Sequence, residues 1–399
     1  MGALTGLTVL DLSRVLAGPF CTQMLSDLGA TVWKVESPWG DDTRRYGPPF
    51  VQGESAYFLA TNRGKKSLAI NLREPRGQDL VRRLAVQADV LVENYKLGDL
   101  ARYGLDYPTL SRLNPRLVYA SITGFGQTGP RAAEPGYDAA LQGFIGLMSV
   151  TGFPDGPPTK VGVAWVDLIT GLTATIGILA AIQERERSGL GQLIDLSLYE
   201  TGLMAMVNQG QSYLATGETP QRLGNAHPQI VPYETFRSSD GWFILGIGND
   251  EQYRRGMLAL GLDDLAVDPG LQANTGRVAR RQELAQRITT QVTSKTTAEW
   301  LRRLNAAGVP ASAVNTVAEA LNDPQAKARG AIWTVNHPAL GPTALLANAL
   351  QHMSRTPAEP ASHPPLLGEH TWEILAHTLG LPQAEIDRLA ADGVITKSN

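Results

Sequence analysis

The chain has 399 residues, of which 43% are hydrophobic and 18% charged, and its formal net charge at pH 7 is −3. This composition is typical of a globular protein, and the length predicts one large domain with a smaller one. The slightly acidic balance argues against nucleic acid as a partner, and the single cysteine, Cys21, excludes an intramolecular disulfide. The N-terminal stretch lacks the basic start of a secretory signal, so we expect a cytoplasmic protein.

Up to about residue 200, short apolar runs alternate with helical patterns, as expected for strand–helix–strand units. Pro19 suits the first helical position of a helix over residues 20–28, and Gly29 can end that helix in the left-handed conformation. A second helix is predicted over residues 78–88, and its apolar face carries Leu80, Val81, Leu84 and Ala85. The predicted strands are residues 7–12, 30–36, 67–72, 90–94 and 117–122. Repeats of this kind predict an α/β, doubly wound, Rossmann-like domain with parallel strands.

The most apolar part of the chain is a helical pattern over residues 168–186. Its core, residues 168–182, is 15 residues long, which falls short of a membrane span and predicts a buried helix. We therefore expect no membrane association. A strand at 193–198 and a helix at 199–215 follow.

The pattern changes beyond residue 220. Residues 233–237 and 242–246, joined by Ser-Ser-Asp-Gly, predict an antiparallel hairpin. Thr296 and Glu299 predict a capping box for a helix that ends near residue 307.

Further helices are predicted at 371–379 and 384–391, after a tail that contains proline-rich loops. The expected domains are a large domain over 1–200 completed by 331–399, a linker over 201–221, and a small α+β domain over 222–330.

Residues 124–129 match the G-x-G-x-x-G pattern of dinucleotide-binding loops and follow a predicted strand. That function needs a helix that starts on the glycines, so that its amide groups face a pyrophosphate. Pro130 and Pro135 argue against such a helix, and the match follows the fifth predicted strand rather than the first. A loop that shapes a pocket is the favoured interpretation.

The sequence lacks the motifs expected of a serine hydrolase or of a metal site. The chain has no G-x-S-x-G, and His227 is the single histidine before residue 330. The five later histidines lack metal-ligand spacing, so no metal site is expected. His227 either lines a pocket or is a loop histidine whose bonds are satisfied locally. The basic residues Arg44, Arg45, Arg63, Lys65 and Lys66 are either a solvated surface or contacts for phosphate or carboxylate groups.

Asp167 lies between apolar runs at 161–166 and 168–181, after a loop rich in proline and glycine. Its local pattern favours a helix N-cap, because a helical pattern follows and aspartate is a preferred cap. The absence of a histidine base favours a nucleophile instead, since a carboxylate with a pKa near ~3.9 is ionised at neutral pH. An acyl-aspartyl anhydride would keep the acyl group activated, which suits transfer between acids. The two interpretations do not exclude each other.

Together these residues resemble the family III CoA-transferases, which include formyl-CoA transferase, carnitine CoA-transferase and α-methylacyl-CoA racemase. The segments that carry the resemblance are VLDLSRVLAGP (9–19), LGATVWKVE (28–36), VENY (92–95), GYD (136–138), DLITG (167–171) and PLLGEH (365–370). Finer likeness to succinyl-CoA:glutarate-type dicarboxylate CoA-transferases lies in YGPPF (46–50), NRGKKSLAIN (62–71) and IVPY (230–233).

The resemblance implies that Asp167 attacks an acyl-CoA thioester and passes through an anhydride and an aspartyl-CoA thioester. It places Tyr137 and Asp138 beside the thioester, and Val15, Leu16 and Ala17 along the pantetheine and acyl carbonyl. Positions implied to contact the nucleotide and pantetheine are Ile70 to Arg73, Asn94, Tyr95, Lys96 and Arg102. It also implies an interlocked homodimer that uses coenzyme A as substrate, without metal, flavin or nicotinamide.

Two residues depart from relatives within the family. Leu16 stands where formyl-CoA transferase has glutamine, which disfavours formyl transfer. Tyr137 stands where the racemase has histidine, which disfavours racemisation because half of the acid–base pair is missing. We expect CoA transfer from succinyl-CoA to a short dicarboxylate, with Arg44 and Arg45 as a hypothetical clamp for the distal carboxylate and His227 as a further acid-binding candidate. Carnitine- or formyl-type transfer, an acyl-CoA racemase or isomerase, and a CoA-binding regulator are the alternatives.

Overall fold

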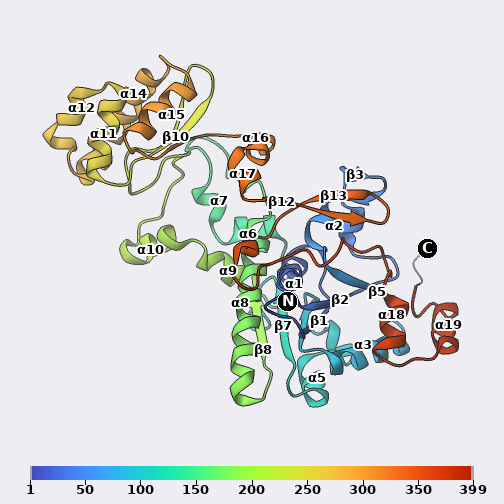
Figure 1. The fold of residues 1–399 in the computed structure, drawn as a ribbon. Coiled ribbons are helices and arrows are strands. Elements are labelled where there is room, and N and C mark those ends of the chain that lie inside the picture. The colour runs from blue at the N-terminus through green and yellow to red at the C-terminus, as the bar shows by residue number, and fades with distance from the viewer. Residues whose placement is uncertain (1, 397–399) are drawn as a thin grey trace. The chain divides into compact units, whose positions relative to one another are not determined.

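The computed structural model describes residues 2–396, which form two compact units (Figure 1). Unit 1 contains the chain up to Leu147, Val161–Gln211 and the chain from Pro324, and unit 2 contains Met148–Lys160 and Ser212–Asp323. The segment 148–160 belongs to unit 2 because it bonds to residues just after 220. The Gly224 N–H donates to the carbonyl of Gly152, and the Arg222 guanidinium donates to the carbonyl of Gly156.

A six-stranded sheet forms the centre of unit 1. Its strands are β1 (Thr8–Asp11), β2 (Thr31–Glu36), β5 (Lys65–Ala69), β6 (Val90–Glu93), β7 (Val118–Thr123) and β8 (Leu193–Ser197). The order is β5-β2-β1-β6-β7-β8 and every pairing is parallel. This is the order of a doubly wound dinucleotide-binding fold, which reverses direction between β1 and β6 and leaves a crevice there. The predicted strands are confirmed, although β5 begins two residues earlier than expected.

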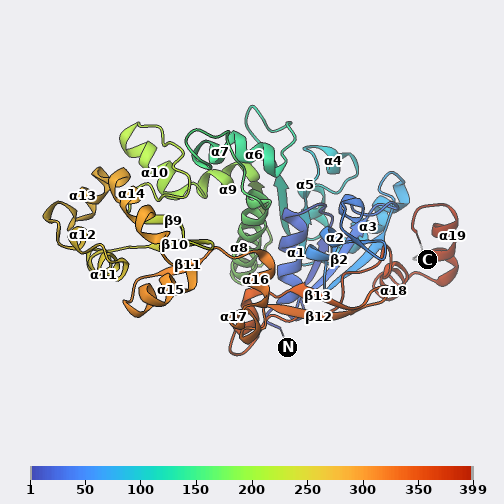
Figure 2. The same ribbon diagram turned by 90° about the horizontal axis from the view of Figure 1, so that it is seen from above.

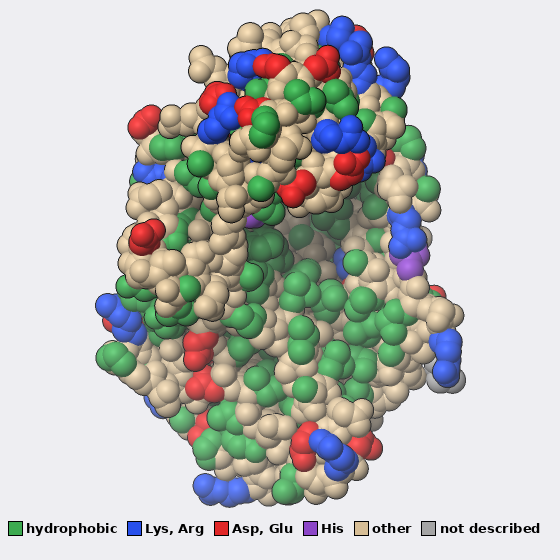
Figure 3. Space-filling view, turned by 90° about the vertical axis from the view of Figure 1, so that its left-hand side faces the viewer, with side chains coloured by type: hydrophobic (Ala, Val, Ile, Leu, Met, Phe, Trp, Pro, Cys, Tyr) green, Lys and Arg blue, Asp and Glu red, His purple; other side chains and the backbone are tan. Residues whose placement is uncertain are grey.

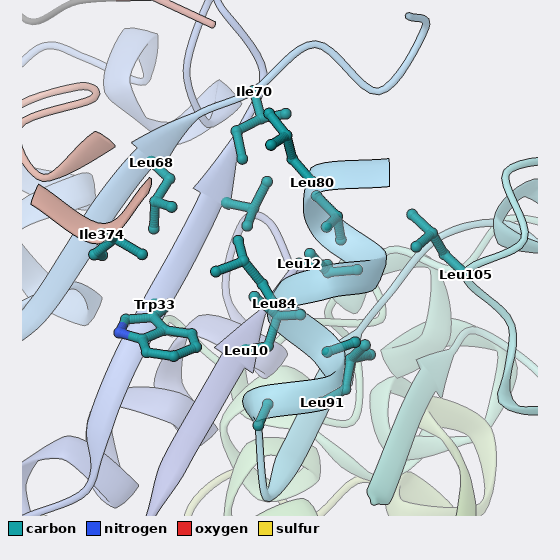
Figure 4. Packing of buried hydrophobic residues seen from close by; sticks show 14 of the residues in the cluster. Leu10, Leu12, Trp33, Leu68, Ile70, Leu80, Leu84, Leu91, Leu105 and Ile374 are labelled. Atoms are coloured by element: carbon teal, nitrogen blue, oxygen red, sulfur yellow. The ribbon is translucent and has the colours of Figure 1, made fainter. Parts of the chain in front are cut away.

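Helices cover both faces of the sheet, because successive strand residues point to opposite faces and both sets are apolar. On one face, Val9 and Val32 pack against α1 (Ala17–Asp27) and α8 (Trp165–Ser188). On the other face lie α3 (Pro75–Gln87), α5 (Tyr107–Leu113), α18 (Thr371–His377) and α19 (Gln383–Ala391). Figure 4 shows Leu10 of β1, and Leu12 just after this strand, among Leu80 and Leu84 of α3, as the predicted apolar face requires.

The start of α1 differs from the prediction. The helix begins at Ala17, so Pro19 is its third residue, where its missing N–H is still not needed for a helical bond. Gly29 follows the helix with φ 104°, a left-handed conformation that favours glycine. The helix end is therefore as expected, and its start lies two residues closer to β1.

Helix α8 is 24 residues long and extends the predicted helix over 168–186 by three residues at its start and two at its end. Within residues 2–396 it is the one helix whose length and apolar composition would suffice to cross a membrane, and 39% of its most apolar window is buried. One such helix is weak evidence, because a helix of a globular core can meet the same criterion. It packs beside α1, as Figures 1 and 2 both show. Hydrophobic side chains also gather on the face that carries α8 and α9 (Leu198–Met204), in the lower part of Figure 3.

The predicted helix over 199–215 is two helices, α9 and α10 (Val207–Thr216), because Val207 has φ 36° and breaks the run. The tail contains an antiparallel hairpin, β12 (Ile332–His337) with β13 (Gly341–Leu346), which was not predicted. The other elements of unit 1 are η1 (Asp42–Arg45), β3 (Phe50–Val51), β4 (Glu54–Ser55), α2 (Ala56–Thr61), α4 (Asp99–Arg102), α6 (Asp138–Phe144), α17 (Pro324–Ala328) and η3 (Ala349–His352), and α7 (Leu147–Val150) lies at the boundary.

Unit 2 has its own core around Trp300, Tyr253 and Phe243. The predicted hairpin is confirmed as β9 (Tyr233–Arg237) and β10 (Trp242–Gly246), and β11 (Ala311–Ala313) joins it. The helices are α11 (Asp250–Leu260), α12 (Asp263–Val267), η2 (Pro269–Leu271), α13 (Asn274–Ala279), α14 (Arg281–Val292), α15 (Thr297–Ala306) and α16 (Val317–Asn322).

The predicted capping box is half formed. The Thr296 hydroxyl accepts the Glu299 N–H, but the Glu299 carboxylate pairs with Lys295 and Arg303.

Candidate active site

A cavity of about 290 Å³ lies where the sheet order reverses. Loops that follow β1, β6 and β7 line it, and so does the first turn of α8. Ligands of doubly wound sheets bind at this position, beyond the carboxyl ends of the strands. The predicted site residues that the cavity brings together are Val15, Leu16, Ala17, Asn94, Tyr95, Lys96, Tyr137 and Asp167.

Asp167 is the third residue of α8, and the N-cap is Ala164. The N-cap interpretation was therefore wrong, and the carboxylate has no hydrogen-bond donor among residues 2–396. Burial and the neighbouring carboxylate of Asp138 raise the pKa of Asp167 to about 7. Ionisation at neutral pH was expected from the ordinary aspartate pKa, and burial beside Asp138 opposes it. A carboxyl perturbed in this way and lining a cavity is a candidate for chemistry.

Gly171 sets the position of Asp167. It lies one turn further along α8, and a Cβ at this glycine would lie 2.7 Å from the carbonyl oxygen of Ala17. The missing side chain lets α8 approach the start of α1 closely. The first turn of α8 is thereby held beside the loop that precedes α1.

The loop before α1 is held in a strained conformation. Val15 has φ 68°, which is unusual for a β-branched residue and costs about 1–3 kcal/mol. The Asn94 side chain forms two hydrogen bonds with the backbone of Arg14. Its Oδ1 accepts the Arg14 N–H at 2.9 Å, and its Nδ2 donates to the Arg14 carbonyl at 2.7 Å. Both carboxylate oxygens of Asp41 accept the Val15 N–H at 3.3 Å.

Sequence reasoning missed Asp41 and its partner. The Lys34 ammonium donates to Asp41 at 3.0 Å, and both side chains are fully buried. The signal that could have found this pair is a lysine in the middle of the apolar strand β2, where an unpaired charge would be costly.

Asp138 is the first residue of α6 and is buried beside the cavity. The Gln142 Nε2 donates to both carboxylate oxygens of Asp138 at 2.9 Å. Sequence reasoning also missed Gln142, although its spacing of four residues from Asp138 places both on one side of a helix.

Three tyrosines stand near the two carboxyl groups. Tyr137 and Tyr46 line the cavity, and the Tyr46 and Tyr57 rings meet edge to face at 5.6 Å between centroids. Burial, followed by the charge of Asp167, raises the pKa of Tyr57 to about 12. Burial also raises the pKa of Tyr46, so the Tyr46 and Tyr57 phenols stay neutral at physiological pH and can donate hydrogen bonds.

A second cavity of about 560 Å³ shares Arg14, Asp42 and Tyr95 with the first. Ile70 and Arg73, both predicted to contact a nucleotide, line it together with Trp39, Arg45 and Tyr103. Arg102 lines neither cavity and forms an ion pair with Asp99. The structure thus places all predicted contact positions for CoA in the two cavities except Arg102 and Asp138, and Asp138 is buried next to Tyr137, which lines the first cavity.

Arg44 does not present its guanidinium to either cavity. Its Nε and Nη2 donate to Glu36 at 2.7 Å each, Nη2 also donates to the Pro365 carbonyl, and the group lies 3.7 Å from the centre of the Phe58 ring. The hypothetical Arg44 clamp therefore lacks structural support, because its donors are already engaged. Arg45 is exposed, lines the second cavity and pairs with Asp42.

Arg63 and Lys65 are neither solvated surface residues nor ligand contacts. Each forms a buried ion pair, Arg63 with Asp27 at 2.6 Å and Lys65 with Asp11 at 3.1 Å. Lys66 is exposed and pairs with Glu373.

His227 lies in unit 2, where its Nδ1 accepts the backbone N–H groups of Gln229 and Ile230 at 3.1 Å. This geometry matches the loop-histidine interpretation. Across residues 2–396, no group of three or more histidine, cysteine, aspartate or glutamate residues could hold a metal ion. No helix begins on Gly124–Gly129, and Thr123 and Gly124 line the first cavity, as the pocket-loop interpretation expects.

Comparison with known proteins identifies the family of the chain. A family model described as CoA-transferase family III matches residues 4–371, so the chain belongs to this family and is a CoA-transferase. It is similar to a succinate–glutarate CoA-transferase of Agrobacterium fabrum, with 46% identity over 94% of this chain and 95% of that protein. A human succinyl-CoA:glutarate CoA-transferase is 39% identical over 98% of this chain and 90% of its own length.

Among solved structures, a CAIB/BAIF family protein from Brucella suis superposes with a TM-score of 0.84. It shares 45% identity over 94% of this chain and 99% of that chain.

Proposed function

We propose that this CoA-transferase moves CoA from succinyl-CoA to a short dicarboxylic acid such as glutarate, with Asp167 as the nucleophile. The supporting observation is a carboxylate without a hydrogen-bond partner in the first cavity, beside the loop that matches the thioester-binding loop of the family. None of the described residues that line this cavity is a histidine. A carboxylate suits such a site, because its ionised form attacks without a base. The named relatives point to the same substrates.

The reaction starts when an Asp167 oxygen attacks the thioester carbonyl, the C–S bond breaks and CoA thiolate leaves. The product is a succinyl-aspartyl anhydride. The thiolate then attacks the aspartyl carbonyl of this anhydride, which releases succinate and leaves an aspartyl-CoA thioester. The acceptor carboxylate displaces the thiolate from this thioester, and the thiolate finally attacks the acceptor's acyl carbonyl. Acceptor-CoA leaves and the Asp167 carboxylate is restored, so no oxidant, reductant or external proton is consumed.

The second cavity suits the nucleotide end of CoA. Arg45 and Arg73 supply guanidinium groups for phosphate oxygens, and Trp39 supplies an aromatic face, with the Arg73 guanidinium 5.7 Å from its ring centre. The residues shared by the two cavities mark the path of the pantetheine arm. Arg44 and His227 were both expected as candidates for binding the acid. We do not assign this role to either residue.

An interlocked homodimer is the assembly that the family resemblance implies, and the surface of unit 1 supports an association. Ile176 of α8 and Met204 of α9 are 67% and 61% exposed. Exposed apolar residues clustered on one face mark interaction surfaces. Size-exclusion chromatography with light scattering should give twice the chain's mass of 42.9 kDa. Cytoplasmic location and activity without a metal or further cofactor stay predictions.

The test is an incubation of the protein with succinyl-CoA and a panel of acids that includes glutarate, malonate, adipate, acetate and carnitine. New CoA esters are identified by mass spectrometry. Formation of glutaryl-CoA or another dicarboxyl-CoA supports the proposal, and hydrolysis without transfer contradicts it. Trapping with hydroxylamine or borohydride during turnover should shift the mass of the peptide that contains Asp167.

A further inference from the structure

Gln142 joins two parts of the site through the two ends of its amide. Its Nε2 donates to Asp138, and its Oε1 accepts the Val161 N–H at 2.8 Å. A carboxylate only accepts and a backbone N–H only donates, so a single orientation of the amide satisfies both partners. The side chain is 1% exposed. A buried amide with both ends engaged in this way holds its partners firmly in place.

The two partners of Gln142 are related to Asp167 in different ways: Asp138 is its neighbouring carboxylate, and Val161 lies in the backbone that leads to it. Val161 opens the short segment that leads into α8, and this segment continues to the N-cap, Ala164. The Trp165 N–H donates to the Val163 carbonyl at 2.8 Å, which fixes the turn just before Asp167. Gln142 thus connects the neighbouring carboxylate to the segment that carries the nucleophile.

We propose that Gln142 is a positioning residue for acyl transfer: it fixes the Asp138 carboxylate next to Asp167 and fixes the entry of α8, so that the nucleophile faces the thioester. This inference rests on the proposed function. Gln142 does not touch the reacting atoms, and it acts through Asp138 and through the backbone of residues 161–164.

The titratable groups that interact with Asp167 are Asp138 from α6 and the Tyr57 phenol, and the phenols of Tyr46 and Tyr137 line the same cavity. A hydrogen bond to a carboxylate favours its charged form, and the Gln142 amide donates to both carboxylate oxygens of Asp138. An ionised Asp138 in turn makes Asp167 harder to ionise. Loss of the Gln142 donor should therefore move the proton towards Asp138 and let Asp167 ionise at lower pH.

The experiment compares Gln142→Met, which keeps the length of the side chain but removes both bonds, with Gln23→Met as a matched control. Gln23 is also 1% exposed, and its amide also bonds at both ends, to the Ala60 carbonyl and the Arg63 N–H. In Gln142→Met we expect kcat to fall about 10- to 100-fold, because small displacements of a nucleophile are costly. The KM for succinyl-CoA should stay within about threefold of the native value. The acid limb of kcat/KM should move down by about one pH unit. Gln23→Met should lose comparable stability but show neither change.

Gln142→Glu provides a second, sharper readout. A protonated glutamic acid has one donor and one acceptor and can replace the amide, whereas its carboxylate repels Asp138. We expect the activity of this variant first to rise with pH as Asp167 ionises, as in the native enzyme, and then to fall as the introduced glutamic acid ionises, along a basic limb absent from the native enzyme. Folding is checked by circular dichroism at each pH.

The inference is overturned if Gln142→Met matches Gln23→Met in kcat and in its acid limb, or if Gln142→Glu shows no additional limb. Asp167→Asn separates this failure from that of the proposed function. If Asp167→Asn is inactive while the Gln142 variants behave like the control, only the positioning role fails. If Asp167→Asn turns over normally, the proposed nucleophile fails and the positioning role fails with it.

Discussion

Gly171 of α8 lies so close to Ala17 of α1 that a methyl group added to the glycine would sit 2.7 Å from the Ala17 carbonyl oxygen. The Gly171→Ala variant must therefore push the two helices apart. We expect it to lose about 1–3 kcal/mol of stability, as in other overpacked cores, and to lose kcat because Asp167 moves with α8. Thermal unfolding and steady-state kinetics measure the two effects.

Gly177 on the same helix is the matched control. Its added Cβ would lie 3.5 Å from the Ile194 side chain, which is an ordinary contact. Gly177→Ala should gain about 0.5–1 kcal/mol from helix propensity and keep native kcat. If both variants behaved alike, the close approach at Gly171 would not control the position of the nucleophile.

Asp167→Asn should fold normally and lose activity by about 10³-fold or more, the scale seen when a nucleophile is removed. The folded pKa of about 7 lies above the unfolded value of 3.8, so the native state binds the extra proton between these values. Native stability from this group is therefore lost as pH rises from about 4 to 7. Denaturant titrations should show that Asp167→Asn gains stability over the native protein along that range. Near-native turnover would remove Asp167 from the mechanism.

Asp138→Asn should shift the pH dependence of activity. In the native enzyme kcat/KM should rise with pH through the Asp167 pKa of about 7, because the ionised form attacks. Removal of the neighbouring negative charge lowers this pKa, so the acid limb should move to lower pH. Asp79→Asn, which also removes one charge but lies on α3 outside both cavities, should leave the limb unchanged.

The adjacent residues Arg44 and Arg45 should respond differently to substitution. Arg44→Ala leaves the buried Glu36 carboxylate without its main partner and should cost about 3–5 kcal/mol. Arg45→Ala removes an exposed pair with Asp42 and should cost less than about 1 kcal/mol. Chemical denaturation compares the two, and KM for the CoA substrate should rise in Arg45→Ala. An unchanged KM would remove Arg45 from the nucleotide site.

Much of the fold could be predicted from local sequence patterns. The sheet could be predicted because its strands are short apolar runs separated by helical periods, and β6 and β7 fall within one residue of expectation. The β12–β13 hairpin was missed because it is half-exposed and contains Pro342, so its apolar alternation is weak.

The candidate site was only partly visible in the sequence. The family motifs were enough to predict that Asp167 and the Val15–Ala17 loop belong to one site. The ion pairs of Arg63 and Lys65 were missed because their partners lie 36 and 54 residues away in the sequence and leave no local signal. The raised pKa of Asp167 could not be foreseen either, because it depends on burial and on Asp138, which a different helix carries.

The division of the chain into units has a consequence for biosynthesis. Unit 2 is an insertion within unit 1, and the last stretch of unit 1 begins at Pro324. Ile374 of that stretch covers Leu68 on the sheet, so this side of the core stays uncovered while the ribosome is still making residues 212–323. Until translation ends, the nascent protein therefore contains a nearly complete sheet with one apolar face exposed to solvent. Exposed apolar surface favours aggregation, so this is the stage at which a chaperone would be of most use.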